Sequence, residues 1–310
     1  MMQVLIIKHG ALGDMVFAQG AFQAIRDHHP SDHLVLLTTS PYKDLANAMG
    51  IFDAVWIDDR PRPLTQTLAC FRLFWKLLQG RFDYVYDLQK SKRTRLYFKL
   101  MKLFFHPMPK WCGKFPGCHF SYPDPAQKDL HIYDRHAKML MVAGINDVPK
   151  PSVAWMTADI SRFHLPKRYF LFVPGCSPTQ LHKRWRAERY GEVAQWLVKQ
   201  KITPVMIGRD EESDAIATIQ KMCPESISLQ GQTTLFDLGP LGRGAVGALG
   251  HDTGPMHIIA VTGCPSVLLF SYSSIPEHYA PRGFNATIIH RQDLNEVGVD
   301  EVLKQLFTQH

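Results

Sequence analysis

One short stretch of the sequence, GHDTGPMHIIA at residues 250–260, carries several chemically different groups close together. Asp252 supplies a carboxylate, Thr253 a hydroxyl, Gly254 a bare backbone and His257 an imidazole. The stretch joins an apolar run to a helix-like MHIIAVTG. A strand-to-helix turn needs only a cap and a glycine. The combination of these groups therefore indicates a binding site.

A second polar stretch follows the apolar run that ends in Pro174-Gly175. It places Lys183 and Arg184 just before a helix-like segment. Cations beside a helix N-terminus favour anion binding, because the backbone N–H groups and the helix dipole add to their charge. A solvated basic turn is the alternative interpretation.

A third stretch, IGRDEESDA at residues 207–215, places carboxylates just past another apolar run. Carboxylates at this point of an α/β sheet often hydrogen-bond ribose hydroxyls, and Glu211 or Glu212 could do so. Acidic residues are also favoured at the start of any helix by its dipole. Both interpretations remain open from the residues alone.

A fourth stretch, KHGALGD, follows the first apolar run of the chain. Gly10 and Gly13 allow a tight turn and a close approach of the backbone to a ligand, and Asp14 stands at the start of the next helix-like segment. A plain helix N-cap is the alternative role for Asp14. The spacing matches neither the dinucleotide-binding G-x-G-x-x-G pattern nor the Walker A pattern.

The excess of positive over negative charge lies in the first half of the chain. Residues 1–155 hold 20 Lys and Arg against 13 Asp and no Glu, whereas residues 156–310 hold 15 against 15. The run at residues 88–114 contains eight cations and no acid. This distribution favours an acidic partner for the first half, with a solvated basic helix as the alternative. The cations nearest the start of the run are Lys90, Lys92, Arg93 and Arg95.

Short apolar runs alternate with helix-like segments along most of the sequence. This alternation predicts an α/β protein with doubly wound parallel sheets. We expect strands at 3–8, 33–39, 53–58, 82–89, 168–175, 203–208, 226–231, 246–254 and 265–273. We expect helices at 14–30, 41–50, 64–80, 186–201, 210–222, 256–263 and 298–309.

A segment rich in Pro and Gly lies between the two halves, and it predicts a boundary near residues 150–165. We expect two Rossmann-like domains, 1–155 and 156–310, with a cleft between them. No run of eighteen apolar residues occurs, so no transmembrane helix is expected, and the N-terminus is typical of a strand rather than a signal peptide. The six scattered cysteines favour a reduced, cytosolic protein and fit no usual zinc pattern.

The polar stretches together resemble glycosyltransferase family nine, the ADP-heptose:lipopolysaccharide heptosyltransferases. DTGPMHIIA is similar to the family's D-T-G-x-x-H signature, and LIIKHGALGDMVFAQGAFQAIR is similar to its first strand, G-D pair and following helix. DYVYDLQKSKRTR, HKRWRAERYGEVAQWL and LQGQTTLFDLGPL resemble further segments of the family. SYSSIPEHY stands where the family more often has G-P-T-D-P. The resemblance covers nearly the whole chain.

This resemblance implies a GT-B fold and a metal-independent, inverting transfer of a sugar from a nucleotide diphosphate. It implies a general base at Asp14 and stabilisation of the leaving diphosphate by Lys183. It further implies donor contacts by Glu212, Asp252, Thr253, Gly254 and His257. The charge distribution, rather than the resemblance, predicts that the acceptor lies on the first half, against Gly13, Lys90, Lys92, Arg93 and Arg95.

The resemblance implies ADP-heptose as donor. The excess positive charge of the first half predicts an anionic acceptor, such as a lipid-linked saccharide of the lipopolysaccharide inner core. No cofactor and no nucleic acid is expected. The protein would work in the cytoplasm, peripheral to the inner face of the bacterial inner membrane. Two alternatives are a GT-B enzyme or epimerase that uses another sugar nucleotide, and a non-catalytic protein that binds anions or nucleic acid through the basic half.

Overall fold

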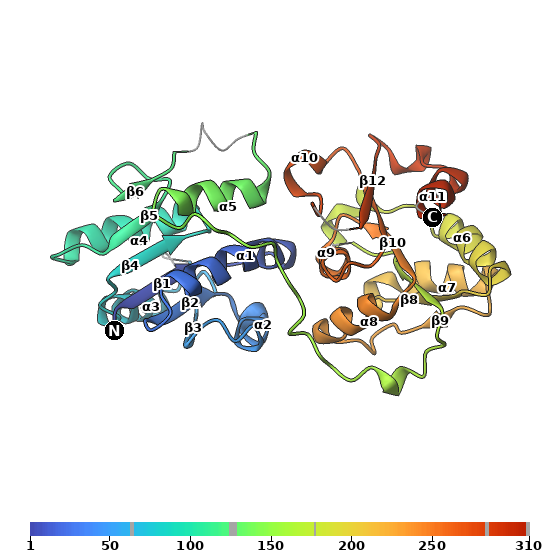
Figure 1. Cartoon of the computed structure of the whole chain (residues 1–310), viewed down its shortest axis with the longest axis horizontal. Coiled ribbons are helices and arrows are strands. Elements are labelled where there is room, and N and C mark those ends of the chain that lie inside the picture. Colours follow the sequence, from blue (N-terminus) through green and yellow to red (C-terminus); the bar gives the residue numbers. More distant parts are fainter. Residues whose placement is uncertain (63–64, 124–128, 177, 283–284, 308–310) are drawn as a thin grey trace. The chain divides into compact units, whose positions relative to one another are not determined.

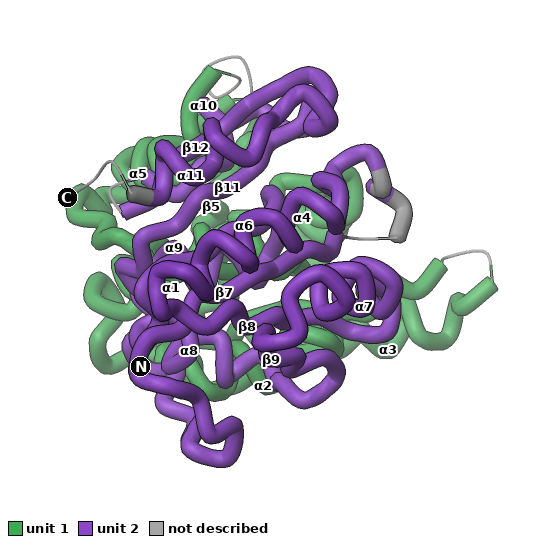
Figure 2. Tube along the Cα trace, turned by 90° about the vertical axis from the view of Figure 1, so that its right-hand side faces the viewer, with its two compact units in different colours: residues 1–151 green, residues 152–310 purple. Residues whose placement is uncertain are grey.

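The computed structural model shows two compact units, Met1–Pro151 (unit 1) and Ser152–His310 (unit 2). Figure 2 colours them separately. The structure describes residues 1–62, 65–123, 129–176, 178–282 and 285–307. The boundary between the two units follows Pro151, four residues before the predicted domain end at residue 155. Residue 64 of one predicted helix and residues 308 and 309 of another lie outside the described residues.

Unit 1 is built on a parallel sheet whose strands lie in the order β3-β2-β1-β4-β5-β6. Its strands are β1 (Gln3–Ile7), β2 (His33–Thr38), β3 (Ala54–Ile57), β4 (Tyr84–Asp87), β5 (Lys110–Gly113) and β6 (Phe120–Ser121). Its helices are α1 (Leu12–His28), α2 (Lys43–Ala48), α3 (Thr67–Gln79), α4 (Lys92–Phe104) and α5 (Ile132–Met141).

Helices cover both faces of the unit 1 sheet (Figure 1). Every second residue of the central strands, among them Leu5 and Ile7, packs against α3 and α4 in one apolar core. Helices α1 and α5 contact each other on the opposite face. Burial on both faces explains why the strands are continuous apolar runs rather than alternating ones.

Unit 2 repeats this plan with the strand order β12-β11-β10-β7-β8-β9, and its pairs are all parallel. Its strands are β7 (Tyr169–Val173), β8 (Thr203–Met206), β9 (Ile227–Ser228), β10 (Gly247–His251), β11 (Ser266–Phe270) and β12 (Ala286–His290). Its helices are α6 (Ala187–Lys199), α7 (Ser213–Met222), α8 (Leu238–Gly244), α9 (Gly254–Val261), α10 (Pro276–Tyr279) and α11 (Val299–Phe307).

The predicted α/β class is confirmed, with one correction to the chain's organisation. The Pro- and Gly-rich segment after α4 was placed between the two halves, yet it contributes β5, β6 and α5 to unit 1. Their sequences, KWCG and FS, lie among prolines and glycines and form no continuous apolar run. Trp111 and Cys112 of β5 are nonetheless fully buried. The sequence prediction also missed β12.

Each sheet reverses its strand order once. In unit 1 the reversal lies between β1 and β4, which pair through Ile7 and Asp87 at their carboxyl ends. In unit 2 it lies between β7 and β10, which pair through Val173 and Gly250. Open α/β sheets bind ligands at the carboxyl ends of strands beside such a switch point. All four predicted polar stretches follow strands that flank or neighbour these two points.

Candidate active site

Asp252 lies just past the end of β10 and connects three segments of unit 2. Its Oδ2 atom lies 3.0 Å from Lys183 Nζ and accepts a hydrogen bond from Ser274 Oγ at 2.5 Å. Its Oδ1 atom lies 3.0 Å from His257 Nε2. Burial disfavours the charge, but His257, Ser274 and Lys183 together hold the pKa of Asp252 well below its usual range. The carboxylate is therefore ionised and fixed in orientation.

Local structure explains why these side chains meet. Helix α9 begins at Gly254 with a proline in its first turn, which suits the fixed φ of that position. His257 lies one turn further along and points back to the carboxylate that precedes the helix. Lys183 approaches from the turn before α6, and Ser274 from the loop after β11. Sequence reasoning missed Ser274, although it had marked its segment as a departure from the family pattern.

His251, the last residue of β10, lies next to Asp252 in the chain and was not identified from the sequence. Its fully buried Nε2 atom accepts a hydrogen bond from the backbone N–H of Trp185 at 2.7 Å. Its Nδ1 atom therefore carries the proton and donates it to the carbonyl of Gly175 at 3.3 Å. Burial lowers the pKa of His251 to about 4, so the ring is neutral. His251 thus joins the ends of β7 and β10 to the segment that carries Lys183.

Of the two candidate ribose acids, the structure constrains Glu212 and leaves Glu211 exposed. Glu212 accepts a hydrogen bond from the Arg209 backbone N–H at 2.8 Å, and its Oε1 atom lies 3.7 Å from Arg184 Nη2. A Cβ atom added at Gly175 would lie only 2.3 Å from the Glu212 carboxyl carbon. Gly175 is thus the residue that lets this carboxylate pack against the end of β7.

Asp14 occupies the third position of α1 in unit 1. Its Oδ2 atom accepts a hydrogen bond from the Ala11 backbone N–H at 3.2 Å, and its Oδ1 atom lies 3.9 Å from Lys8 Nζ. Burial lowers the pKa of Lys8, with Asp14 and Asp87 acting in the opposite direction. The Asp14 side chain remains 36% exposed, so its carboxylate can still reach a substrate. The contact with Ala11 is also what a helix-starting residue would make, and the catalytic role stays a prediction.

A buried cluster beside this position was not foreseen from the sequence. Asp58, at the end of β3, lies 3.0 Å from His9 Nε2 and 2.9 Å from both Arg93 Nε and Arg93 Nη2. It also accepts a hydrogen bond from Tyr97 Oη at 2.6 Å. Burial disfavours its charge, yet His9, Arg93 and Tyr97 hold the pKa of Asp58 well below its usual range. Arg93 therefore anchors α4 to β3, and its predicted contact with an acceptor stays a prediction.

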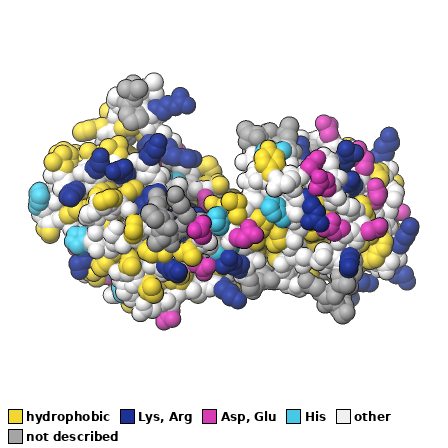
Figure 3. All heavy atoms as spheres, turned by 90° about the horizontal axis from the view of Figure 1, so that it is seen from above, with side chains coloured by type: hydrophobic (Ala, Val, Ile, Leu, Met, Phe, Trp, Pro, Cys, Tyr) yellow, Lys and Arg dark blue, Asp and Glu magenta, His cyan; other side chains and the backbone are white. Residues whose placement is uncertain are grey.

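The other predicted acceptor cations, Lys90, Lys92 and Arg95, lie in the first turn of α4 or just before it. The backbone N–H of Lys90 donates to buried Asp87 at 2.8 Å, and burial, assisted by Lys8, lowers the pKa of Lys90 to about 8. Lys92 and Arg95 are exposed and line a hollow of about 410 Å³ with Lys114. In Figure 3, Lys and Arg side chains lie among hydrophobic ones over unit 1, the lobe at left. Gly13 lies in the first turn of α1, next to Asp14.

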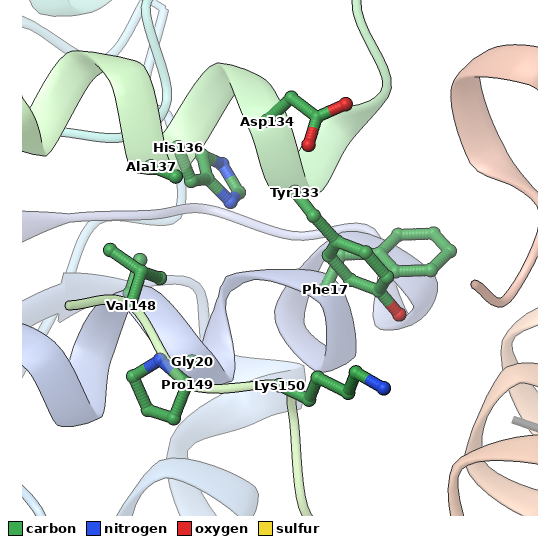
Figure 4. Close-up of a pocket in the computed structure, with 10 residues that line it drawn as sticks. Phe17, Gly20, Tyr133, Asp134, His136, Ala137, Val148, Pro149 and Lys150 are labelled. Atoms are coloured by element: carbon green, nitrogen blue, oxygen red, sulfur yellow. The ribbon is translucent and has the colours of Figure 1, made fainter. Parts of the chain in front are cut away.

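A smaller cavity of about 130 Å³ lies between α1 and α5 (Figure 4). Phe17 and Tyr133 line one part of it and pack edge to face with ring centroids 5.3 Å apart. His136 lines another part, and burial holds its pKa well below the usual range. The cavity thus combines two aromatic rings with a neutral imidazole.

The described part of the chain holds neither a cluster of metal-ligating side chains nor a membrane-spanning helix. No three His, Cys, Asp or Glu side chains come together there as metal ligands would. No helix in the same ranges has both the length and the apolar character to span a bilayer.

Solved structures with the same architecture identify the fold class of this protein. A crystal structure of a glycosyl transferase family 9 protein from Veillonella parvula aligns with a TM-score of 0.78 at 18% identity, covering 99% of this chain and 96% of that one. The Escherichia coli heptosyltransferase WaaC with ADP-2-deoxy-2-fluoro heptose aligns with a TM-score of 0.75 at 16% identity, covering all of both chains. The fold is therefore GT-B, a pair of Rossmann-like units, as predicted.

Sequence comparison gives the family itself. The model of glycosyltransferase family 9 (heptosyltransferase) matches residues 120–305, and the chain belongs to this family. A lipopolysaccharide heptosyltransferase 2 from Escherichia coli K12 is 23% identical over 325 residues, covering 93% of this chain and 88% of that relative. The protein is thus a glycosyltransferase, as the sequence motifs predicted.

Proposed function

We propose that this enzyme transfers heptose from ADP-heptose to an anionic, lipid-linked saccharide acceptor, with inversion and without a metal ion. The observation that carries this proposal is the assembly of Lys183, His257 and Ser274 on Asp252 at the switch point of unit 2. Family membership supports the reaction class. The ADP-sugar bound to one structural neighbour and the lipopolysaccharide named for one relative support the substrates.

In the proposed reaction, an acceptor hydroxyl oxygen bonds to the anomeric carbon of the sugar while the bond from that carbon to the diphosphate breaks. Asp14 takes the hydroxyl proton as general base, which requires only a carboxylate within hydrogen-bond reach. The electron pair of the broken bond leaves on ADP. Attack from the side opposite the leaving group inverts the anomeric centre.

The leaving diphosphate gains negative charge as the bond breaks, and Lys183 is the group we assign to it. An ammonium has three N–H donors, and the contact with Asp252 uses one of them. Asp252 therefore positions Lys183 and leaves donors for phosphate oxygens. The backbone N–H groups at the start of α9 come from Thr253, Gly254 and Met256, because Pro255 has none, and they would add the positive end of the helix dipole. Donors that are held in place before the reaction stabilise developing charge most effectively.

The nucleotide would be held on the neighbouring strand of the same sheet. Glu212 is the acid we assign to the ribose hydroxyls, because its carboxylate is held at the carboxyl end of β8 while Glu211 is exposed. The acceptor would bind on unit 1, near Gly13 and Asp14, with Lys90, Lys92, Arg93 and Arg95 facing its anionic groups. We place the enzyme at the cytoplasmic face of the bacterial inner membrane, where a lipid-linked acceptor would be met.

A ligand-binding screen with the intact enzyme tests the donor. ADP-heptose should raise the melting temperature and support turnover in EDTA, whereas UDP- and GDP-sugars should do neither. Lys183→Met should weaken ADP binding by about ten- to a hundredfold, because hydrogen bonds between charged groups contribute that much. Lys199→Met, on the exposed surface of α6, is the matched control and should leave ADP binding unchanged. A preference for another nucleotide, or equal ADP affinity in both variants, would refute the assignment.

A further inference from the structure

Two neighbouring helices of unit 1 expose large apolar side chains to solvent. On α3 these are Phe71, 60% exposed, and Trp75, 51% exposed, and on α4 Leu103 is 66% exposed. Leu68 on α3 and Leu96 on α4 are exposed as well. We call the outer surface formed by these five residues the α3–α4 face. Exposed apolar groups this large and this close together mark an interaction site rather than an ordinary surface.

Helical periodicity shows that the exposure is a property of whole helix faces. Leu68, Phe71 and Trp75 follow the three-to-four spacing of one stripe of α3, while Leu73 and Leu77 on its other side enter the core. The rings of Phe71 and Trp75 stack with centroids 6.1 Å apart. Both helices pack on the same face of the unit 1 sheet and contact each other. The stripes therefore belong to one continuous surface.

The charge on this surface has one sign. Neither α3 nor α4 contains an Asp or Glu residue. Arg72 on α3 and Lys99 and Lys102 on α4 are exposed and flank the apolar stripes. A helix surface with aromatic and Leu side chains in the middle and cations at its edges is typical of proteins that lie on an anionic bilayer. The long cationic side chains can reach headgroup phosphates while the rings enter the acyl boundary.

We infer that the α3–α4 face is a membrane-docking surface that binds an anionic lipid bilayer directly. The commitment to a bilayer rests on charge complementarity, since a surface with cations and no acid matches a continuous sheet of phosphate headgroups. A second copy of the chain would instead place these cations against one another. The inference deepens the proposed function, because it names the surface that brings the enzyme to a lipid-linked acceptor.

Vesicle binding without donor or acceptor tests the inference separately from the reaction. The intact protein should co-sediment with vesicles of phosphatidylglycerol and phosphatidylcholine, and much less with phosphatidylcholine alone. Raising the salt should weaken binding without abolishing it, because apolar insertion is not screened. Trp75 fluorescence contributes to a blue shift on binding, which the Trp75→Ser variant should reduce.

Two variants separate the apolar and the ionic contributions. Phe71→Ser with Trp75→Ser should weaken vesicle binding by at least about tenfold through lost apolar burial. Arg72→Gln with Lys99→Gln and Lys102→Gln should weaken binding on the order of a hundredfold to anionic vesicles only. Met141→Ser on α5 is the matched control, because Met141 is 54% exposed on the other side of the sheet.

The outcomes divide cleanly between the two proposals. Normal melting temperatures for all variants, with binding lost only in the α3–α4 variants, support the docking surface. Binding to vesicles that none of the α3–α4 changes alters would overturn it, and so would dimerisation that these changes abolish while vesicle binding is absent. Turnover of a short, lipid-free acceptor should be unchanged in these variants. If that turnover is absent even in the wild type, the proposed function fails while the docking surface stands.

Discussion

At the scale of single residues, Asp252 is the group on which the unit 2 site depends. Its two oxygens contact Lys183, His257 and Ser274, three residues that are far apart in the sequence. Removing the carboxylate would leave buried Lys183 without its partner, which is costly in a poorly solvated position. We therefore propose Asp252 as a positioning residue and Lys183 as the group that contacts the substrate.

The role of Asp14 can be tested by a change that preserves its local contact. Asp14→Asn keeps a side-chain oxygen that can accept from the Ala11 N–H, but an amide cannot take a proton. We expect kcat to fall by about 10² to 10⁴ while the affinity for ADP stays unchanged. Steady-state kinetics and calorimetric ADP titration measure the two quantities. A lower melting temperature together with near-normal kcat would show that Asp14 is only a helix-starting residue.

At the scale of elements, His251 shows how strand ends are joined. It connects the carbonyl after β7 to the backbone N–H at the start of α6 from a position at the end of β10. This arrangement requires a neutral ring, because Nε2 must accept a hydrogen bond. The hydrogen bonds of the His251 ring thus hold the segment that carries Lys183 to the sheet, and protonation of the ring would break one of them.

Stability should therefore depend on pH through His251. Its folded pKa of about 4 lies below the ordinary 6.5, so the unfolded chain binds the proton more readily. The stability it contributes is present above pH 6.5 and is lost as pH falls toward 4, on the order of 3 kcal/mol in total. We expect His251→Gln to be less stable at pH 7 and to show a smaller loss of stability between pH 6.5 and 4. Denaturant titrations at several pH values measure this, and parallel pH profiles for both proteins would contradict it.

At the scale of the whole molecule, charge separates the two units. Unit 1 contains all of the excess positive charge, with 20 Lys and Arg against 13 Asp, and unit 2 is balanced. The exposed cations at the start of α4, Lys92 and Arg95, stand beside a hollow that a charged saccharide could enter. Arg93 does not share this exposure, because it is bound to Asp58.

Salt should act on the two substrates differently. Ionic attraction between exposed groups is screened beyond about 8 Å at physiological salt, so the acceptor KM should rise strongly with salt and the donor KM much less. Lys92→Gln with Arg95→Gln should reproduce the effect of high salt on the acceptor alone, and it leaves the Arg93–Asp58 pair intact. Initial rates at varied acceptor and salt concentrations check this. An acceptor KM that is flat in salt and insensitive to both changes would mean that this basic surface is merely solvated.

The sequence by itself determined the α/β class, the doubly wound pattern and the family. Buried parallel strands are continuous apolar runs, and the loops that follow them gather glycines, carboxylates and cations such as Gly254, Asp252 and Lys183. These apolar runs and loop residues are adjacent in the chain, so they can be recognised from the sequence alone. The sequence did not reveal β5 and β6, because KWCG and FS lie among prolines and glycines and form no continuous apolar run.

The tertiary structure alone decided which polar residues become partners. Ser274 contacts Asp252 only because β10 and β11 are neighbouring strands. Arg93 forms an ion pair with Asp58 because α4 and the end of β3 lie close together. His251 received no role from the sequence, although it stands next to Asp252, since its partners Trp185 and Gly175 come from other elements. Burial and hydrogen bonding depend on neighbours far along the chain, and residue type alone does not encode them.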